Sequence, residues 1–89
     1  MPQNKEILKL YGFVVRSPNR KRVLLELSES PRIPTDIAKR LNINVNHVSR
    51  ALSELKSKGL VSCINPEEKR GRVYTISEIG RKVLDNIST

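Results

Sequence analysis

The sequence has 89 residues, enough for one small domain, and 17 lysines and arginines against 9 acidic residues give it a formal net charge of +8. This surplus favours a polyanionic partner, either nucleic acid or an anionic membrane surface, although charge can also serve solubility alone. No apolar run reaches the roughly 20 residues that span a bilayer, and no segment resembles a signal peptide, so we expect a soluble cytoplasmic protein with no membrane partner.

The first expected helix covers residues 4–15, where apolar side chains recur at helical spacing and occupy most of the circumference. Such a helix must be buried on several sides. In so short a chain, a second copy of the protein is the obvious cover. We therefore predict a homodimer with interface residues Ile7, Leu8, Leu10, Tyr11, Phe13, Val14, Val83, Leu84 and Ile87. The alternatives are a short strand at residues 13–15 and a monomer whose N-terminal helix covers its own core.

A capping serine followed by proline, Ser17-Pro18, predicts a second helix that runs to about Ser28. Three of its residues are expected to face inward: Val23, Leu24 and Leu27. Three cations occupy its first turns: Arg20, Lys21 and Arg22. Cations near a helix N-terminus oppose the helix dipole, so their placement hints at contacts with phosphate groups. A solvated charge cluster is the alternative.

Pro34 predicts the start of a short third helix over residues 34–41, with a weak cap because Ile33 stands where serine or threonine is expected. We also expect a very short strand at Ile33. The inward residues would be Ile37, Ala38 and Leu41, and the outward cations Lys39 and Arg40. A turn at 42–44 follows. The segment has the helix-turn-helix pattern: a short helix, a small residue (Ala38) where two helices would cross, a tight turn and a second amphipathic helix.

Residues 44–58 predict that second helix, which Asn44 caps and Gly59 ends in a left-handed conformation. Its expected apolar stripe consists of Val45, Val48, Leu52 and Leu55. The opposite face carries Asn46, His47, Ser49, Arg50 and Ser53. A solvated helix usually carries Glu and Lys there, whereas these side chains suit the reading of base edges in the DNA major groove.

Residues 60–64 and 72–76 are rich in β-branched side chains and predict two strands, joined by a polar turn at 65–71. A hairpin that follows a recognition helix is a wing, here residues 65–72. Its cations are Lys69, Arg70 and Arg72. Their position favours contact with phosphates or the minor groove. Cys63, the only cysteine, is expected to be a small buried hydrophobe, with a redox-sensing thiol as the less favoured alternative.

Ser77 predicts the cap of a last helix, whose expected apolar face consists of Ile79, Val83, Leu84 and Ile87. The whole pattern is that of a mainly α protein with a small β-hairpin, an α+β winged helix-turn-helix with extra terminal helices. We expect a single domain over residues 1–89. It divides into an N-terminal dimerisation helix (1–16), a winged-helix core (17–76) and a C-terminal helix (77–89).

Residues 17–80 resemble winged helix-turn-helix transcriptional regulators, in particular small single-domain regulators common in archaea and related to the MarR and ArsR groups. The matching stretches are IPTDIAKRL (33–41), NHVSRALSELKSKGLV (46–61) and RVYTISEIG (72–80). The resemblance implies homodimers, base contacts from the second helix of the motif, and a wing that touches an adjacent groove. It also implies backbone contacts from Lys39, Arg40, Lys69, Arg70 and Arg72.

This chain lacks the cysteine pair, or the clustered histidines and acids, of metal-sensing ArsR relatives, and it is shorter than typical MarR proteins. We therefore expect no metal, no cofactor and no small-molecule ligand. One histidine, one cysteine and the lack of a Gly-rich phosphate loop argue against an enzyme. The sequence predicts a sequence-specific regulator that binds double-stranded DNA. The alternative is a winged-helix module that docks on protein or binds RNA.

Overall fold

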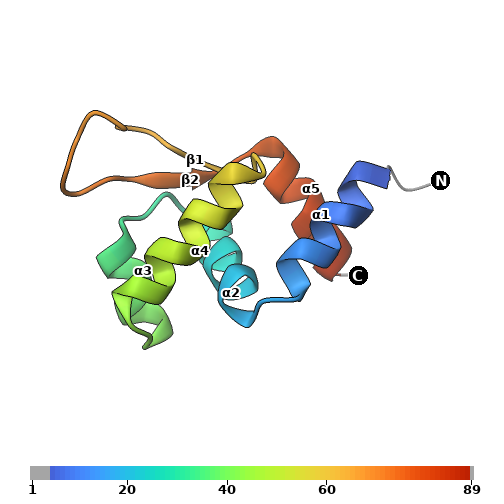
Figure 1. Cartoon of the computed structure of the whole chain (residues 1–89), viewed down its shortest axis with the longest axis horizontal. Coiled ribbons are helices and arrows are strands. Elements are labelled where there is room, and N and C mark those ends of the chain that lie inside the picture. Colours follow the sequence, from blue (N-terminus) through green and yellow to red (C-terminus); the bar gives the residue numbers. More distant parts are fainter. Residues whose placement is uncertain (1–4, 89) are drawn as a thin grey trace.

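The computed structural model describes residues 5–88 of the chain, with side chains as far as Ile87. The elements run in the order α1 (Lys5–Val15), α2 (Pro18–Glu29), α3 (Pro34–Leu41), α4 (Val45–Ser57), β1 (Val61–Cys63), β2 (Tyr74–Ile76) and α5 (Glu78–Ser88) (Figure 1). Residues 1–4 and 89, which the predicted terminal segments include, lie outside this range. The predicted fold class, an α+β winged helix, is confirmed.

Side-chain caps place the helix starts where the sequence predicts them. Ser17 Oγ accepts a hydrogen bond of 3.3 Å from the backbone N–H of Arg20, and Pro18 occupies the first turn of α2. Asn44 Oδ1 accepts one of 2.7 Å from the N–H of Asn46 at the start of α4. Each cap satisfies an amide that the helix itself leaves unpaired. Ile33 provides no side-chain cap for α3, as expected.

The turn between α3 and α4 depends on Asn42, whose φ of 56° and ψ of 48° are left-handed. Asparagine tolerates this conformation better than most residues, so α3 can end there and the chain can reverse. The N–H of Ile43 then donates to the carbonyl of Ala38 at 3.1 Å. Because Ala38 is small and buried, α4 packs closely across α3.

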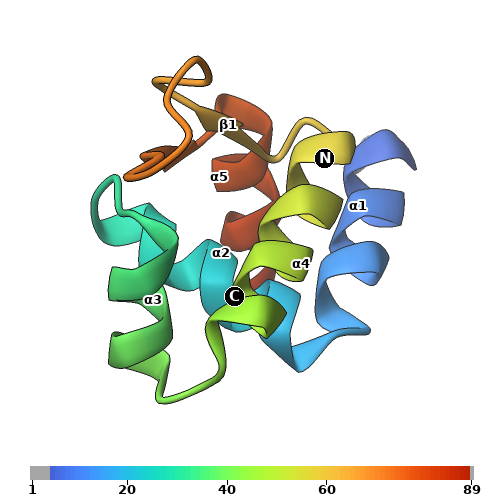
Figure 2. The same cartoon turned by 60° about the vertical axis from the view of Figure 1, so that its left-hand side comes forward.

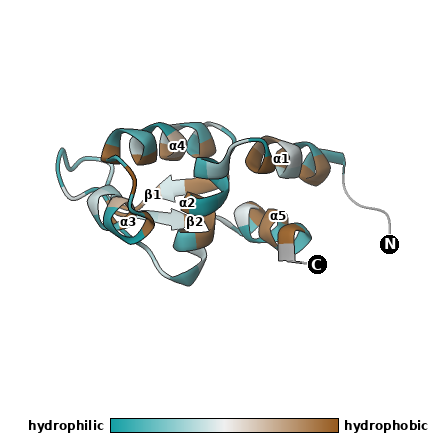
Figure 3. Cartoon of the chain, turned by 90° about the horizontal axis from the view of Figure 1, so that it is seen from below, coloured by the Kyte–Doolittle hydropathy of each residue, from teal (hydrophilic) through white to brown (hydrophobic). Residues whose placement is uncertain are grey.

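The core lies among α2, α3, α4 and the hairpin, and extends between α1 and α5 (Figure 2). It consists of Val14, Val23, Leu24, Leu27, Ile37, Ala38, Val48, Ala51, Leu52, Leu55, Leu60, Val61, Ile76, Val83 and Leu84. In Figure 3, apolar segments recur in the helices, whereas the loop of the wing is hydrophilic. The wing, α3 and the start of α4 lie at one end of the molecule, and α1 and α5 lie at the other (Figure 1).

Two residues assigned to apolar stripes face outward instead. Val45 is 37% exposed because it lies about 60° around the helix axis from Val48, at the edge of the buried stripe. Ala51 completes that stripe. Ile79 is also exposed, because the neighbouring Gly80 is the residue of α5 that packs against the hairpin.

Three of the residues predicted at a dimer interface, Val14, Val83 and Leu84, are buried inside the chain itself. Helices α1 and α5 pack against each other and cover these side chains, so they are not available to a second copy. The alternative of a strand at residues 13–15 is also wrong, since α1 continues through Val15.

The hairpin pairs Val61 with Ile76, Ser62 with Thr75 and Cys63 with Tyr74. Both strands are shorter than predicted. The short strand expected at Ile33 is displaced by one residue: Arg32 forms an isolated bridge with Tyr74. Its N–H donates to the Tyr74 carbonyl at 3.1 Å, and the Tyr74 N–H donates back at 2.9 Å. This bridge attaches the segment before α3 to the hairpin.

Candidate nucleic-acid interface

The outer face of α4, defined as Asn46, His47, Ser49, Arg50 and Ser53, is exposed along its length. None of these side chains forms a hydrogen bond or an ion pair with any other described residue. The buried Val48, Leu52 and Leu55 hold the opposite side of the helix in the core. The structure therefore presents five polar side chains on a fixed helix, with their donors and acceptors open to a partner.

The wing is fixed in shape by bonds within its own loop. Asn65 Oδ1 accepts from the N–H of Val73 at 2.8 Å, and Asn65 Nδ2 donates to the carbonyl of Gly71 at 3.2 Å. Arg72 Nε donates to the carbonyl of Glu68 at 2.6 Å, and Gly71 has a φ of 66° that suits glycine. Lys69 and Arg70 are exposed at the tip without an ion pair among the described residues.

A hollow of about 530 Å³ lies where the wing, the start of α3 and the outer face of α4 meet. It is lined by Ile33, Pro34, Thr35, Ser49, Lys69, Arg70, Gly71, Arg72 and Tyr74. The backbone N–H groups at the N-terminus of α3 add partial positive charge to that of the three wing cations. Ser49 is thus brought together with Lys69, Arg70 and Arg72, although the sequence separates them by about 20 residues. Thr35 joins this group and was not predicted.

Arg20 is not a free cation. Its Nε lies 3.0 Å from Glu54 Oε1, its Nη1 donates to the Phe13 carbonyl at 2.7 Å, and its guanidinium stacks over the Phe13 ring at 3.9 Å. The guanidinium group of this predicted phosphate ligand is therefore already engaged in contacts inside the chain. Its neighbours Lys21 and Arg22 are exposed and have no ion pair among the described residues.

Arg40 belongs to an ion-pair network between α2 and α3 that sequence analysis did not identify. Its Nε lies 2.6 Å from Glu26 Oε1, and its Nη2 lies 3.4 Å from Glu29 Oε1. The hydrogen bond and the charge of Glu26 raise the pKa of Arg40, so it stays charged. Arg32 joins the network through Glu26 at 3.7 Å and through Glu29 and Asp36 at 3.2 Å each. The only signal of this network in the sequence is the spacing of three and four residues that separates Arg32 from Glu29 and Asp36. Lys39 is exposed and outside the network.

Within residues 5–88, no three histidine, cysteine or acidic side chains are grouped so as to hold a metal ion. Over the same range, no helix combines the length and the apolar character needed to cross a membrane. Cys63 is half-buried, with its Sγ 3.6 Å from Asn65 Oδ1.

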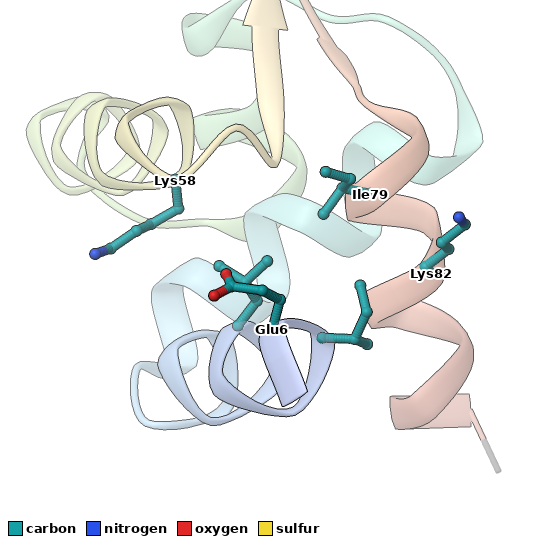
Figure 4. A pocket seen from close by; sticks show the side chains of 6 residues that line it. Glu6, Lys58, Ile79 and Lys82 are labelled. Carbon is teal, nitrogen blue, oxygen red and sulfur yellow. The ribbon is translucent and has the colours of Figure 1, made fainter. Parts of the chain in front are cut away.

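A second hollow of about 500 Å³ lies between α1, the end of α4 and α5, away from the wing. It is lined by Glu6, Ile7, Leu10, Lys58, Ile79 and Lys82 (Figure 4). Figure 4 shows that the amino groups of Lys58 and Lys82 point away from it. Two of the predicted dimer residues, Ile7 and Leu10, therefore line an open apolar depression.

Solved structures share this fold over most of the chain. TubR bound to 24 bp of tubC, from Bacillus thuringiensis serovar israelensis pBtoxis, matches with a TM-score of 0.78 and 14% identity over 99% of this chain and 96% of that one. A MarR family transcription regulator matches with a TM-score of 0.72 and 24% identity over 81% of this chain and 49% of that one.

The C30S mutant of Lactococcus lactis ZitR, in complex with DNA, matches with a TM-score of 0.69 and 20% identity over 81% and 50% of the two chains. The chain spans about half the length of the MarR-family regulator and of ZitR. These similarities show the fold, which is that of MarR-family winged-helix regulators.

No protein of curated function matches the sequence. The family model described as HVO_A0261 N-terminal domain matches residues 9–89. Because this match covers nearly the whole sequence, the chain belongs to the HVO_A0261 N-terminal domain family.

Proposed function

We propose that this protein is a transcriptional regulator that binds specific sequences in double-stranded DNA, with α4 in the major groove and the wing on the backbone or in the minor groove. The observation that carries the proposal is the outer face of α4, whose side chains are exposed and unbonded within the described chain. Such donors and acceptors can pair with base edges without first losing an internal bond. The winged-helix fold and the two neighbours solved with DNA support the same assignment.

In this proposal the outer face of α4 reads bases and exposed cations hold the phosphates. The phosphate ligands are Lys21, Arg22, Lys39, Arg40, Lys69, Arg70 and Arg72. Arg40 is exposed and oriented by Glu26, so it can bind a phosphate while it keeps this partner. Arg20 is left out because its guanidinium is already occupied. The hollow beside Ser49 would take the sugar–phosphate backbone next to the bases that α4 reads.

The proposal includes a homodimer. After Val14, Val83 and Leu84 are removed from the predicted interface, Leu8 remains exposed on α1, and Ile7 and Leu10 line the open hollow. Leu8 lies outside that hollow, and the half-buried Ile7 and Leu10 are the side chains that a partner seated in it would cover. Most such pairs have two-fold symmetry, which would place two copies of α4 in successive major grooves about 34 Å apart.

Selection of bound duplexes from a random DNA library tests the proposal directly. We expect a near-palindromic site to be enriched. Arg50→Ala should weaken binding to it by about 1–3 kcal/mol and relax the preference at one base position, as the loss of a bidentate guanine contact would. Arg81→Ala, which removes an exposed arginine from α5, is the matched control and should bind like the parent.

The alternative function is a winged-helix module for RNA or protein, and the same material distinguishes it. A library with no enriched sequence, together with tighter binding to single-stranded RNA than to duplex DNA at equal salt, would exclude the DNA proposal. Equal binding of all duplexes by the parent, Arg50→Ala and Asn46→Ala would show that α4 does not read the bases.

A further inference from the structure

Val45 is an apolar residue placed among the polar side chains at the start of α4. It occupies the first position of that helix and is 37% exposed. Its chain neighbours Asn44 and Asn46 are exposed as well, and so is Ser49 one turn later. Single exposed apolar residues are common, so exposure alone assigns no role to this valine. Its position is the informative feature.

The helical geometry puts Val45 on the flank of α4 that leads to the wing. At about 100° per residue, Val45 lies only about 40° around the axis from Ser49, which lines the hollow between the wing and α3. His47 lies about 160° away, on the other flank with Glu54. In the proposed complex with DNA, a side chain at the first turn and on this flank would enter the groove together with Asn46 and Ser49.

We infer that Val45 is a specificity-determining residue that contacts the 5-methyl group of a thymine in the bound DNA. The inference rests on the proposed function and goes beyond it, because the polar outer face can select hydrogen-bonding edges only. The thymine methyl is the one apolar group that unmodified bases present in the major groove. A branched aliphatic side chain cannot pair with an amide or a carbonyl, so among base edges this methyl group is its natural partner.

The contact gains free energy because both groups are exposed before binding and leave water together. Valine is also stiff at χ1, so little side-chain entropy is lost when the methyl groups pack. One methyl group taken out of water corresponds to about a fourfold change in affinity. The predicted discrimination of thymine from a base without the methyl group is therefore small, but it is confined to one position in each half-site.

The test uses the duplex enriched from a random library, with each thymine replaced in turn by deoxyuridine, which lacks only the 5-methyl group. For the parent protein we expect about a fourfold loss of affinity at one thymine per half-site and no loss at the others. For Val45→Ala that deoxyuridine effect should disappear, and its affinity for the unmodified duplex should fall to about that of the parent on a duplex that carries the deoxyuridine in both half-sites. Leu25→Ala, with a side chain 38% exposed on α2, is the matched control and should keep the parent's pattern.

The deoxyuridine ratio is taken within each protein, so a change in the folded fraction of a variant cancels from it and the ratio decides the test. The inference is overturned if no thymine substitution affects the parent, if the enriched site has no thymine in the bases that α4 covers, or if Val45→Ala retains the full loss. A library that enriches no sequence overturns the proposed function and this inference together. An enriched site without a methyl effect overturns the inference alone.

Discussion

Arg20 joins three segments of the chain through a single guanidinium group. It contacts the carbonyl and the ring of Phe13 at the end of α1, and it pairs with Glu54 on α4. Phe13 is also approached by Lys58, whose Nζ lies 5.5 Å from the ring centroid. The cation that was expected to face phosphate therefore connects the N-terminal helix to the helix that carries the candidate interface.

Arg20→Ala is expected to lower the free energy of unfolding by about 1–2 kcal/mol, because it removes two hydrogen bonds of a charged group and a ring contact that are only partly screened by water. Urea denaturation measures this change. Arg22→Ala, two residues away on the exposed side of α2, should leave the midpoint unchanged. For DNA binding the order should reverse: Arg22→Ala should make the plot of log affinity against log salt concentration shallower, and Arg20→Ala should leave its slope unchanged. A shallower slope for Arg20→Ala, together with parent-like stability, would show that Arg20 contacts phosphate and does not hold the helices together.

At the scale of elements, α5 meets the hairpin through a glycine. A Cβ atom added at Gly80 would collide with the backbone carbonyl of Leu60 and would lie 2.6 Å from Ile76 Cγ1. Ser77, which caps α5, strengthens this contact between α5 and the hairpin. Its Oγ accepts from the Gly80 N–H at 3.0 Å and donates to the Gly59 carbonyl at 2.6 Å. The end of α4, the hairpin and α5 therefore share one close contact.

Gly80→Ala should reduce the free energy of unfolding by about 1–3 kcal/mol, since the carbonyl of Leu60 has to move to admit a methyl group. Gly12→Ala in α1 is the matched control, because nothing lies within 4 Å of a Cβ there. This second change should stabilise the protein by up to about 1 kcal/mol through helix propensity. Thermal unfolding of both variants gives the comparison. Equal midpoints would mean that α5 does not dock through Gly80.

The wing is expected to contribute affinity with little base specificity. Replacing Lys69, Arg70 and Arg72 together by alanine should make the plot of log affinity against log salt concentration shallower by about 0.9 for each phosphate contact that is lost. Titrations at several salt concentrations measure this slope. Preference among enriched sites should stay the same. An unchanged slope would show that the wing does not contact DNA phosphates.

Helices α2 to α5 were predictable because each has a local signal: a cap at Ser17, Asn44 or Ser77, a proline at its start, or a glycine at its end. Helix α1 has no such signal and was predicted from the spacing of its apolar residues alone. The outward position of Val45 and the inward position of Gly80 were not predictable, since both depend on the rotation of a helix against distant elements. The pairing of Arg40 with Glu26 brings together residues from two helices. Sequence spacing does not encode such a contact. Val14 was assigned to the dimer interface for the same reason: the packing of α1 against distant helices, which buries it in the core, cannot be read from sequence spacing.

At the scale of the whole molecule, oligomeric state is the property with the largest consequence for DNA binding. We expect a dimer in sedimentation equilibrium at micromolar concentration. Leu8→Glu should shift it toward monomer, because Leu8 is 48% exposed and a charge there would be desolvated on pairing. Leu25→Glu, on α2, should not. A monomeric parent protein with full affinity for a palindromic site would contradict the proposed dimer.

The side chains on the outer face of α4 take no part in holding the described chain together. Under the proposed function, selection on folding and selection on target sequence act on different residues of the same helix. A lineage can replace Asn46, Ser49 or Arg50 without first acquiring compensating changes in the core, because surface substitutions usually change stability by less than about 0.5 kcal/mol. A single substitution would then be enough to change the DNA sequence that the protein prefers. A gene duplicate could acquire its own set of targets while its fold stays unchanged.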